Sequence, residues 1–189
     1  MRVSIYLAGN IEKINHKIEN STWREGFKEK LRESLTGVDL KFLDPSVRRD
    51  DTKHTYSIFA QDVFFVANCS FVVVYGSKKQ GIGTGIEMLT AKMHGVPVIS
   101  VVPKNSYYRC PDKASMERLS EKDVENWVHP FMLNLSDVIV ENLDQAAEWI
   151  KEHLNEKKKI KDHSVINKAI EYYKKNHYDK DEQAKEAFG

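Results

Sequence analysis

The chain has 189 residues, and its 29 basic and 28 acidic side chains leave a net charge of only +1 at pH 7. A balance this even excludes a nucleic-acid or membrane surface built on bulk charge and favours a small-molecule ligand. The length fits one domain with its own core and an appended tail. Two cysteines, Cys69 and Cys110, are too few for a disulfide framework or a metal cluster, and we interpret both as packed or incidental thiols.

Apolar runs in this sequence are short. None approaches the ~18 residues that cross a bilayer, and the first ten residues lack the apolar segment of a signal peptide. The sequence therefore predicts a cytoplasmic protein that does not enter a membrane.

The first third of the chain predicts a strand, a helix and a second strand. Apolar and polar residues alternate over residues 2–7, with Tyr6 on the face opposite the apolar one. After a turn at Gly9 and a polar loop, apolar residues recur every fourth position and predict an amphipathic helix: Trp23, Phe27, Leu31 and Leu35. Leu40–Leu43 forms the second predicted strand. The loop that follows it is charged and holds Arg48, Arg49, Asp50 and Asp51.

Tyr56–Cys69 predicts a second helix that is rich in Phe and Val, so we expect it to be largely buried. Asp62 interrupts its apolar sequence. A carboxylate in such a helix must be hydrogen-bonded, paired or turned towards a cavity, because leaving it dry and unpaired costs several kcal/mol, roughly.

Residues 70–101 predict a strand, a helix and another strand, which together form one βαβ unit. Phe71–Tyr75 and Val96–Val101 are continuous apolar runs, which are typical of strands covered on both faces in a parallel sheet. A glycine-rich turn, Gly81–Gly85, leads into a helix that runs through His94. Glu87 is the only acid in this unit. We expect it near the first turn of the helix, where the helix dipole stabilises a carboxylate.

The remaining elements complete the alternation. A loop at residues 103–111 precedes a helix that we expect to start at Ser120, with Val124, Trp127, Val128 and Phe131 on its apolar side. Asp137–Val140 predicts a fifth strand, and Asn142 with Gln145 caps a helix that runs to Leu154. Residues 163–175 predict one more helix, and the last dozen residues a frayed tail.

This order of elements predicts an α/β fold. Strands and helices that alternate form a three-layer sandwich around a five-stranded parallel sheet, with right-handed crossovers, as in flavodoxin-like or Rossmann-like proteins. We assign residues 1–154 to this domain and residues 155–189 to a Lys-rich tail, helical or partly disordered.

In such a sheet the loops after the strands open on one edge, where ligands bind. Residues 81–85 do not continue as GxGxxG, because the last position of that motif is Met88, and no Walker lysine follows. What remains is a backbone that a sugar or phosphate can approach, with the carboxylate of Glu87 directly behind it. A carboxylate that attacks an anomeric carbon, or stabilises the oxocarbenium ion, is suited to splitting a glycosidic bond.

Several segments together resemble the nucleoside 2-deoxyribosyltransferase-like superfamily, which includes deoxyribosyltransferases and nucleotide N-glycoside hydrolases. The segments are Ile5–Gly9, Trp23–Arg24, Asp62 and the run GIGTGIEMLTAKMHGVPVI from Gly81 to Ile99. The resemblance covers residues 1–103, and its most specific part is G-x-G-x-E followed by a helix, His-Gly and an apolar strand.

The resemblance implies a role for three side chains. Glu87 matches the nucleophile that takes the sugar C1′ as the base departs, and Tyr6 matches the tyrosine that orients this glutamate. Asp62 matches the aspartate that contacts sugar hydroxyls or helps the base to leave. The residues that we expect to bind substrate are Gly9, Asn10, Arg24, Ser77, Gly81, Gly83, Thr84 and Gly85.

Gly81 departs from the pattern of the enzymes that take free nucleosides, which carry an aspartate there, close to the 5′-hydroxyl. An acid would repel a 5′-phosphate, so glycine, with Ser77 and two lysines nearby, favours a nucleotide. Two further departures are Asn10, where the family often has proline, and Asn68, where it usually has aspartate.

Each candidate also has a plain structural interpretation. Glu87 could cap its helix, Asp62 could hold a loop, and Tyr6 could be an ordinary aromatic residue on the sheet. Arg24 could bind phosphate or base, or form a surface ion pair. Trp23 is interpreted as a core anchor, and the charges that are solvated by default are Arg48, Arg49, Lys78 and Lys79.

These features predict an enzyme that cleaves the N-glycosidic bond of a (deoxy)nucleoside or its 5′-monophosphate and passes the sugar to another base or to water. Two alternatives stay open: a non-catalytic nucleotide sensor, and a glycohydrolase acting on a dinucleotide such as NAD. The histidines show no metal-ligand spacing, and the reaction needs no metal or cofactor. The resemblance implies a homo-oligomer. Phe59, Phe64 and Phe65 could form its contact face, or a buried face within one chain.

Overall fold

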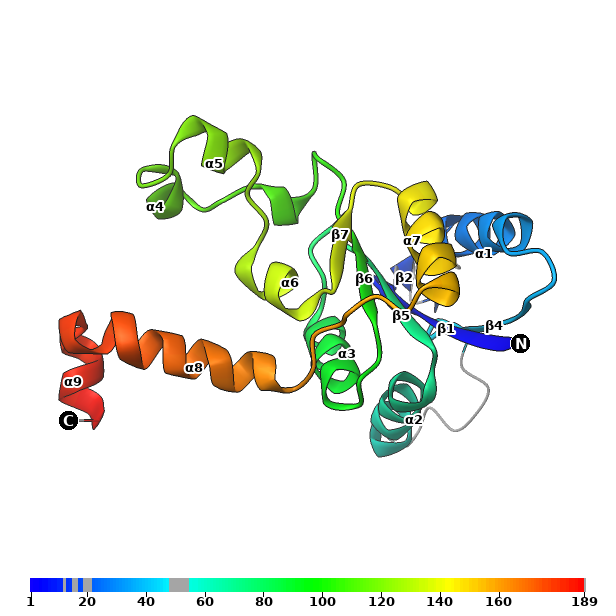
Figure 1. Ribbon diagram of the computed structural model, residues 1–189, viewed down its shortest axis with the longest axis horizontal. Coiled ribbons are helices and arrows are strands. Elements are labelled where there is room, and N and C mark those ends of the chain that lie inside the picture. Colours follow the sequence, from blue (N-terminus) through cyan, green and yellow to red (C-terminus); the bar gives the residue numbers. More distant parts are fainter. Residues whose placement is uncertain (12, 15–16, 19–21, 48–54, 189) are drawn as a thin grey trace.

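A five-stranded, all-parallel sheet forms the centre of the protein (Figure 1). The computed structural model describes residues 1–11, 13–14, 17–18, 22–47 and 55–188. The strands lie in the order β4-β1-β5-β6-β7. Their bounds are Asp39–Leu43 for β4, Arg2–Gly9 for β1, Phe71–Tyr75 for β5, Val98–Val101 for β6 and Val138–Val140 for β7. The predicted fold class is thereby confirmed.

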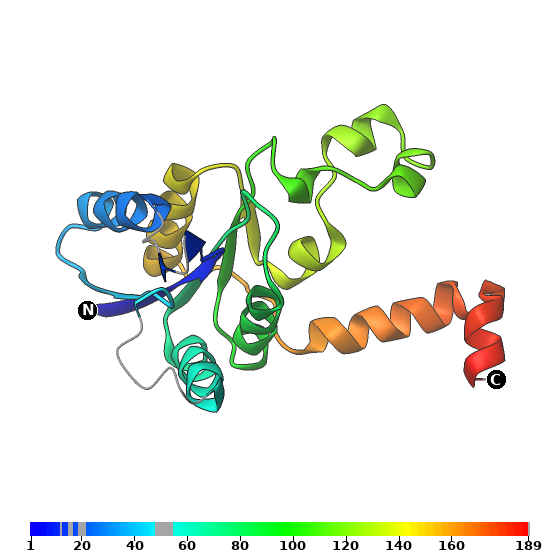
Figure 2. The same ribbon diagram turned by 180° about the vertical axis from the view of Figure 1, so that it is seen from behind.

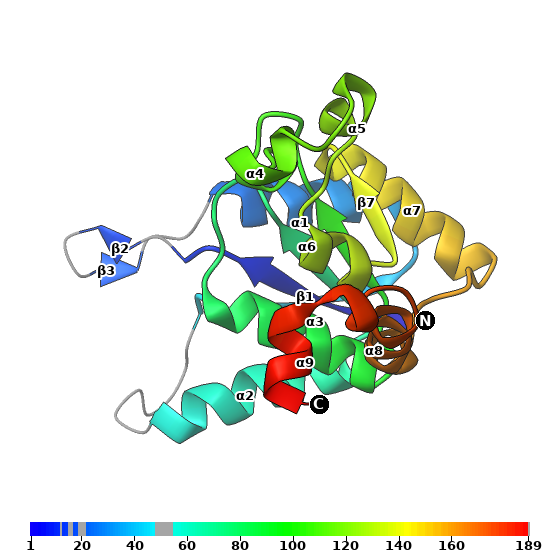
Figure 3. The same ribbon diagram turned by 90° about the vertical axis from the view of Figure 1, so that its left-hand side faces the viewer.

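Helices cover both faces of this sheet, as Figure 3 shows in end view. α1 (Thr22–Ser34) and α7 (Leu143–Asn155) pack on the face that receives Val3, Ile5 and Leu7 of β1. The other face receives Tyr6 and Ala8 and is covered by α2 (Thr55–Asn68), α3 (Ile82–Met93) and α6 (Pro130–Leu135). Alternate residues of β1 therefore serve two cores, as the alternation in the sequence predicts.

The helix expected from Ser120 to Phe131 is instead two short helices, so that prediction is wrong. α5 (Glu121–Glu125) begins after Ser120, whose side chain accepts a hydrogen bond from the backbone N–H of Asp123. His129 has a φ of −47° and a ψ of 126°, which are not helical, and Pro130 begins α6. Proline disfavours a helical conformation in the residue before it, which explains the break. A 3₁₀ turn at Tyr107–Arg109 and α4 (Lys113–Met116) also lie in this connection.

α2 is less buried than its composition predicts. Tyr56, Phe59 and Phe64 are 77%, 52% and 64% exposed, whereas Phe65 and Val66 pack against the core. The helix lies at the side of its layer, next to α3 (Figure 3), so only one of its faces meets the protein. A short antiparallel pair, β2 (Lys13–Ile14) and β3 (Lys17–Ile18), occupies part of the expected polar loop.

The C-terminal segment ends in a helix rather than a frayed tail. α8 (Ser164–Asn176) extends away from the sandwich, and α9 (Glu182–Phe188) turns back at its far end (Figures 1 and 2). Asp181 caps α9 by accepting a hydrogen bond from the backbone N–H of Ala184 at 3.0 Å, and it also accepts one from the Tyr173 hydroxyl. In the described part of the chain, no helix is both long and apolar enough to cross a membrane.

Candidate active site

The candidate site lies where the chain changes direction in the sheet. β1 pairs with β4 on one side and with β5 on the other. A crevice forms at such a switch point, at the carboxyl ends of the strands. Tyr6 reaches it from β1 and Glu87 from α3, and the Tyr6 hydroxyl donates a hydrogen bond to Glu87 Oε1 at 2.8 Å.

Asp62 of α2 reaches the same hydroxyl. It precedes β5 by about two helical turns, so the sequence left open whether it meets this edge. The Tyr6 phenol interacts with the side chains of both Glu87 and Asp62. Three residues that are distant in the sequence therefore meet at one oxygen atom.

The environment of Tyr6 keeps its phenol protonated. Burial is the largest effect, because it disfavours the phenolate, and the neighbouring charges of Glu87 and Asp62 act in the same direction. Together they raise the pKa of Tyr6 far above its ordinary value. Tyr6 therefore keeps the single proton that it donates to Glu87.

Glu87 lies in the second turn of α3 rather than near the first, because the helix begins at Ile82. The stabilising effect of a helix N-terminus falls off within the first turn. The hydrogen bond from Tyr6 therefore helps to orient this carboxylate, and the helix dipole contributes less than the sequence suggested.

The glycines of the turn before α3 leave space beside the carboxylate. A Cβ atom added at Gly83 would lie 4.0 Å from Glu87 Oε1. Cβ atoms at Gly81 and Gly85 would meet no described atom within 4 Å. Gly81 has a φ of −76°. The glycines of this turn therefore matter because they lack a side chain, and not because their backbone conformation is unusual.

Gly9 is the last residue of β1. Its φ of 153° is rarely adopted by other residues, and a Cβ atom there would lie 3.2 Å from Cζ2 of Trp23. The Trp23 ring stacks on Tyr75 with centroids 4.8 Å apart, so Trp23 packs against the end of β5. Asn10 follows Gly9 and is exposed.

Arg24 does not lie at the surface, so the ion pair that it forms is a buried one rather than the expected surface pair. Its side chain is 1% exposed and forms an ion pair with Asp44, with Nε 3.4 Å from Oδ1. It donates hydrogen bonds to three backbone carbonyls at the end of β1: Leu7, Gly9 and Asn10. The Arg24 side chain is therefore buried in this structure.

The loop after β5 is held by two residues that the sequence did not identify as site residues, Gln80 and Tyr108. The Gln80 side-chain amide donates to the carbonyls of Tyr75 and Lys78 at 2.9 and 2.7 Å, and its backbone N–H donates to the Tyr108 hydroxyl at 2.9 Å. Ser77 is half-buried in this loop. Lys79 places its ammonium over the Tyr107 ring. Arg48 and Arg49 lie outside the described residues.

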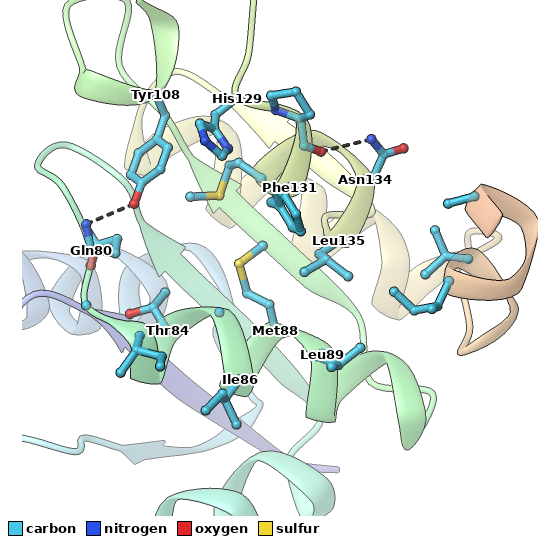
Figure 4. Close-up of a pocket in the computed structure, with 18 residues that line it drawn as sticks. Gln80, Thr84, Ile86, Met88, Leu89, Tyr108, His129, Phe131, Asn134 and Leu135 are labelled. Carbon is cyan, nitrogen blue, oxygen red and sulfur yellow. Dashed lines mark hydrogen bonds between the residues drawn. The ribbon is translucent and has the colours of Figure 1, made fainter. Parts of the chain in front are cut away.

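Thr84 faces away from this crevice. It lines a separate groove of about 620 Å³ between α3, α6 and the start of α8. Figure 4 shows Met88 and Leu89 of α3 facing Phe131 and Leu135 of α6 across it. Glu87 and Tyr6 do not line the groove. Gly81 and Gly85 do line it, so the glycine turn borders both spaces.

The described residues include no cluster of three His, Cys, Asp or Glu side chains that could hold a metal ion. Both cysteines are free, with Cys69 buried and Cys110 exposed.

No protein-family profile and no curated protein sequence matches the chain. Among solved structures, the chain is similar to a CMP N-glycosidase of Clostridium botulinum, BcmB, with a TM-score of 0.40 and 12% sequence identity. The match covers 79% of this chain and 98% of that chain. A TM-score this low carries no inference about activity.

Proposed function

We propose that this protein is an enzyme that cleaves the N-glycosidic bond of a (deoxy)nucleoside or its 5′-monophosphate, with Glu87 as the nucleophile. The observation that carries the proposal is the hydrogen bond from Tyr6 to Glu87 Oε1 at 2.8 Å, with Asp62 acting on the same hydroxyl. It supports the proposal because a nucleophilic carboxylate needs a fixed orientation, and a buried phenol that stays protonated supplies one.

The proposed cleavage uses two side chains of the protein, Glu87 and Asp62. A carboxylate oxygen of Glu87 forms a bond to C1′ while the bond from C1′ to the base nitrogen breaks, and the base leaves with the electron pair. In this proposal Asp62 holds sugar hydroxyls or, when protonated, gives a proton to the departing base. A water molecule or a second base then attacks C1′, gives up one proton and releases Glu87 as a carboxylate, and this proton balances the one that the departing base takes up.

The open space at Gly81, Gly83 and Gly85 supports a ligand whose sugar lies against the turn. The absence of an acid at position 81, with Lys78 and Lys79 in the preceding loop, favours a 5′-monophosphate.

We propose further that the protein forms a homo-oligomer. Tyr56, Phe59 and Phe64 expose their rings on the outer face of α2, which supports the interpretation of this helix as a contact face. Analytical ultracentrifugation of wild type and of a Phe59→Ser/Phe64→Ser variant measures this directly. A monomeric wild type, or a variant that assembles normally, would contradict this assignment.

The experiment that tests the proposed activity compares wild type with Glu87→Gln on a panel of nucleosides, 5′-monophosphates and NAD, with and without an acceptor base, followed by chromatography. Glu148→Gln is the matched control, because it makes the same change on an exposed residue of α7, across the sheet. We expect Glu87→Gln to lose turnover while still binding substrate, and the control to keep both.

The products distinguish the possible reactions. New nucleosides that form only with acceptor establish a transferase, free base regardless of acceptor establishes a hydrolase, and release of nicotinamide establishes a dinucleotide glycohydrolase. Absence of turnover in wild type, with equal ligand binding by Glu87→Gln, would reject the enzyme and favour a sensor.

A further inference from the structure

The β4 side of β1 loses its partner strand before β1 ends. Pairing with β4 stops at Tyr6 and Leu43, whereas pairing with β5 continues to Gly9 and Tyr75. Among the described residues, no strand continues along β1 on the β4 side beyond Tyr6. Backbone carbonyls on that side need another partner, because a buried carbonyl without a hydrogen bond is costly.

Arg24 supplies that partner. Its Nε donates to the carbonyl of Leu7 at 3.3 Å, Nη2 to that of Gly9 at 3.1 Å and Nη1 to that of Asn10 at 3.4 Å. A guanidinium presents several N–H groups in a rigid plane, so one side chain can hold successive carbonyls of a loop. The side chain takes the place of the missing strand.

Asp44 holds the guanidinium in place. Asp44 is the first residue after β4, and its Oδ1 accepts hydrogen bonds from the backbone N–H and the hydroxyl of Ser46 at 2.9 and 2.6 Å. Its Oδ2 accepts a hydrogen bond from Lys28 Nζ at 3.0 Å. A carboxylate anchored in this way is a fixed counter-charge for the buried Arg24.

The backbone that Arg24 holds is the wall of the candidate site. Tyr6 directly precedes the held segment, and its hydroxyl orients Glu87. Gly9 lies within that segment, where a Cβ atom would be in tight contact with the Trp23 ring, 3.2 Å from Cζ2. The Arg24 guanidinium lies 4.7 Å from the centre of the same ring.

We propose that Arg24 is a positioning residue, which fixes the backbone of residues 7–10 and through it the Tyr6 phenol, rather than a group that binds the phosphate or base. The proposal rests on the proposed function for its kinetic consequence, but its structural part is independent of any activity.

The test compares Arg24→Lys with Arg32→Lys, the same change on an exposed arginine of the same helix. Lysine keeps the charge but loses the planar set of donors. Hydrogen exchange by mass spectrometry, without ligand, is the first readout. We expect faster exchange in peptides covering residues 7–11 of Arg24→Lys only. Unchanged exchange there would overturn the proposal, whether or not the protein proves to be an enzyme.

Kinetics separate positioning from binding. If Arg24 positions Tyr6, Arg24→Lys lowers kcat by about 10- to 100-fold, and equally for a nucleoside and its 5′-monophosphate. If it binds phosphate, KM rises for the monophosphate alone, and this result would overturn the proposal. Wild type without turnover on the whole panel rejects the proposed function, and the exchange experiment then decides on Arg24.

Asp44→Asn is the second variant, for the case that Arg24→Lys does not fold. It removes the counter-charge while keeping an oxygen that can accept from Ser46. The same segment should exchange faster than in wild type, and exchange equal to that of wild type would count against the proposal.

Discussion

Tyr6 and Glu87 form the contact on which the proposed chemistry depends. Burial and two neighbouring carboxylates raise the pKa of the Tyr6 phenol, so its proton is retained through the alkaline range in which enzymes are assayed. Tyr6 belongs to the sheet and Glu87 to a helix packed on it. Their hydrogen bond therefore also links α3 to β1. One side chain thus serves both packing and orientation.

Replacing Tyr6 by Phe should slow turnover without changing the fold. A hydrogen bond to a charged group is worth roughly 1.5–3 kcal/mol, so we expect kcat to fall about 10- to 150-fold. Because the folded pKa is raised, the wild-type pH–rate profile should show no loss of activity from ionisation of Tyr6 at alkaline pH. Tyr107→Phe, on an exposed tyrosine, is the control. Wild-type kcat in Tyr6→Phe would contradict the orienting role.

The two cysteines should differ in reactivity. Burial raises the pKa of the Cys69 thiol to about 12 and hydrogen bonds from backbone groups only partly oppose this effect. Cys110 is exposed. The thiolate is the reactive form, so a thiol reagent at pH 8 should modify one cysteine per native chain. Cys110→Ser should abolish fast labelling, and two fast equivalents in native wild type would show that Cys69 is accessible.

The C-terminal end of α3, the helix that carries Glu87, is tied to the start of β7. Lys92 forms an ion pair with Asp137, and both side chains are 0% exposed. Asp137 also accepts hydrogen bonds from the backbone N–H groups of Val98 and Lys161 at 2.7 and 2.6 Å. One carboxylate therefore joins a helix, a strand and the C-terminal segment.

Lys92→Met should destabilise the protein strongly, because it leaves Asp137 as a buried charge without its counter-ion. Breaking one half of a buried pair costs about 3–5 kcal/mol, which urea unfolding measures as a lower transition midpoint. Lys151→Met, on the exposed side of α7, is the matched control and should stay close to wild type. A Lys92→Met midpoint equal to that of the control would show that the pair contributes little.

At the scale of the whole molecule, the Lys-rich segment is attached more firmly than its composition suggests. The backbone N–H of Lys158 donates to His153 Nδ1 at 3.2 Å, and Lys161 Nζ donates to the carbonyls of Leu133 and Ser136 at 2.9 and 2.7 Å. The His153 ring contacts the rings of both Trp149 and Phe71. The connection between α7 and α8 is thus docked on the sandwich, and α8 and α9 extend away from it (Figure 1).

This docking should make stability depend on pH. Burial, and then the charge of Lys157, lower the pKa of His153 below its ordinary 6.5, so the folded state favours the neutral ring whose Nδ1 accepts the hydrogen bond. The unfolded state takes up a proton on His153 below about pH 6.5. The contribution of the neutral His153 ring to stability is therefore complete above that pH, and it is lost as the pH falls towards the folded pKa.

Urea unfolding at pH 7.5 and 5.5 tests this expectation. The loss of stability on acidification should be smaller in His153→Asn than in wild type, and unchanged in His177→Asn, which alters an exposed histidine. Equal pH dependence in wild type and His153→Asn would exclude His153 as the titrating group.

The sequence predicted the sheet most accurately where strands are buried on both faces. Phe71–Tyr75 has the same bounds in the structure as in the prediction, because a continuous apolar run is compatible only with a central strand. The Asn142 cap is also as predicted, since a side-chain oxygen three residues before a free N–H acts locally. Pro130 by itself predicts a break in the helix before it. The helical spacing of apolar residues on both sides favoured one continuous helix instead.

By itself, the sequence determined the class of fold, the edge of the sheet where a site forms, and the pairing of Glu87 with a glycine turn, because each follows from local pattern and from the parallel order of strands. Only the tertiary structure decided that Asp62 meets Tyr6, that Arg24 is buried against the end of β1, and that the rings of α2 face outward. These facts depend on which helix face meets a neighbour and on where a partner strand stops. Contacts between distant segments set both, and residue spacing does not encode them.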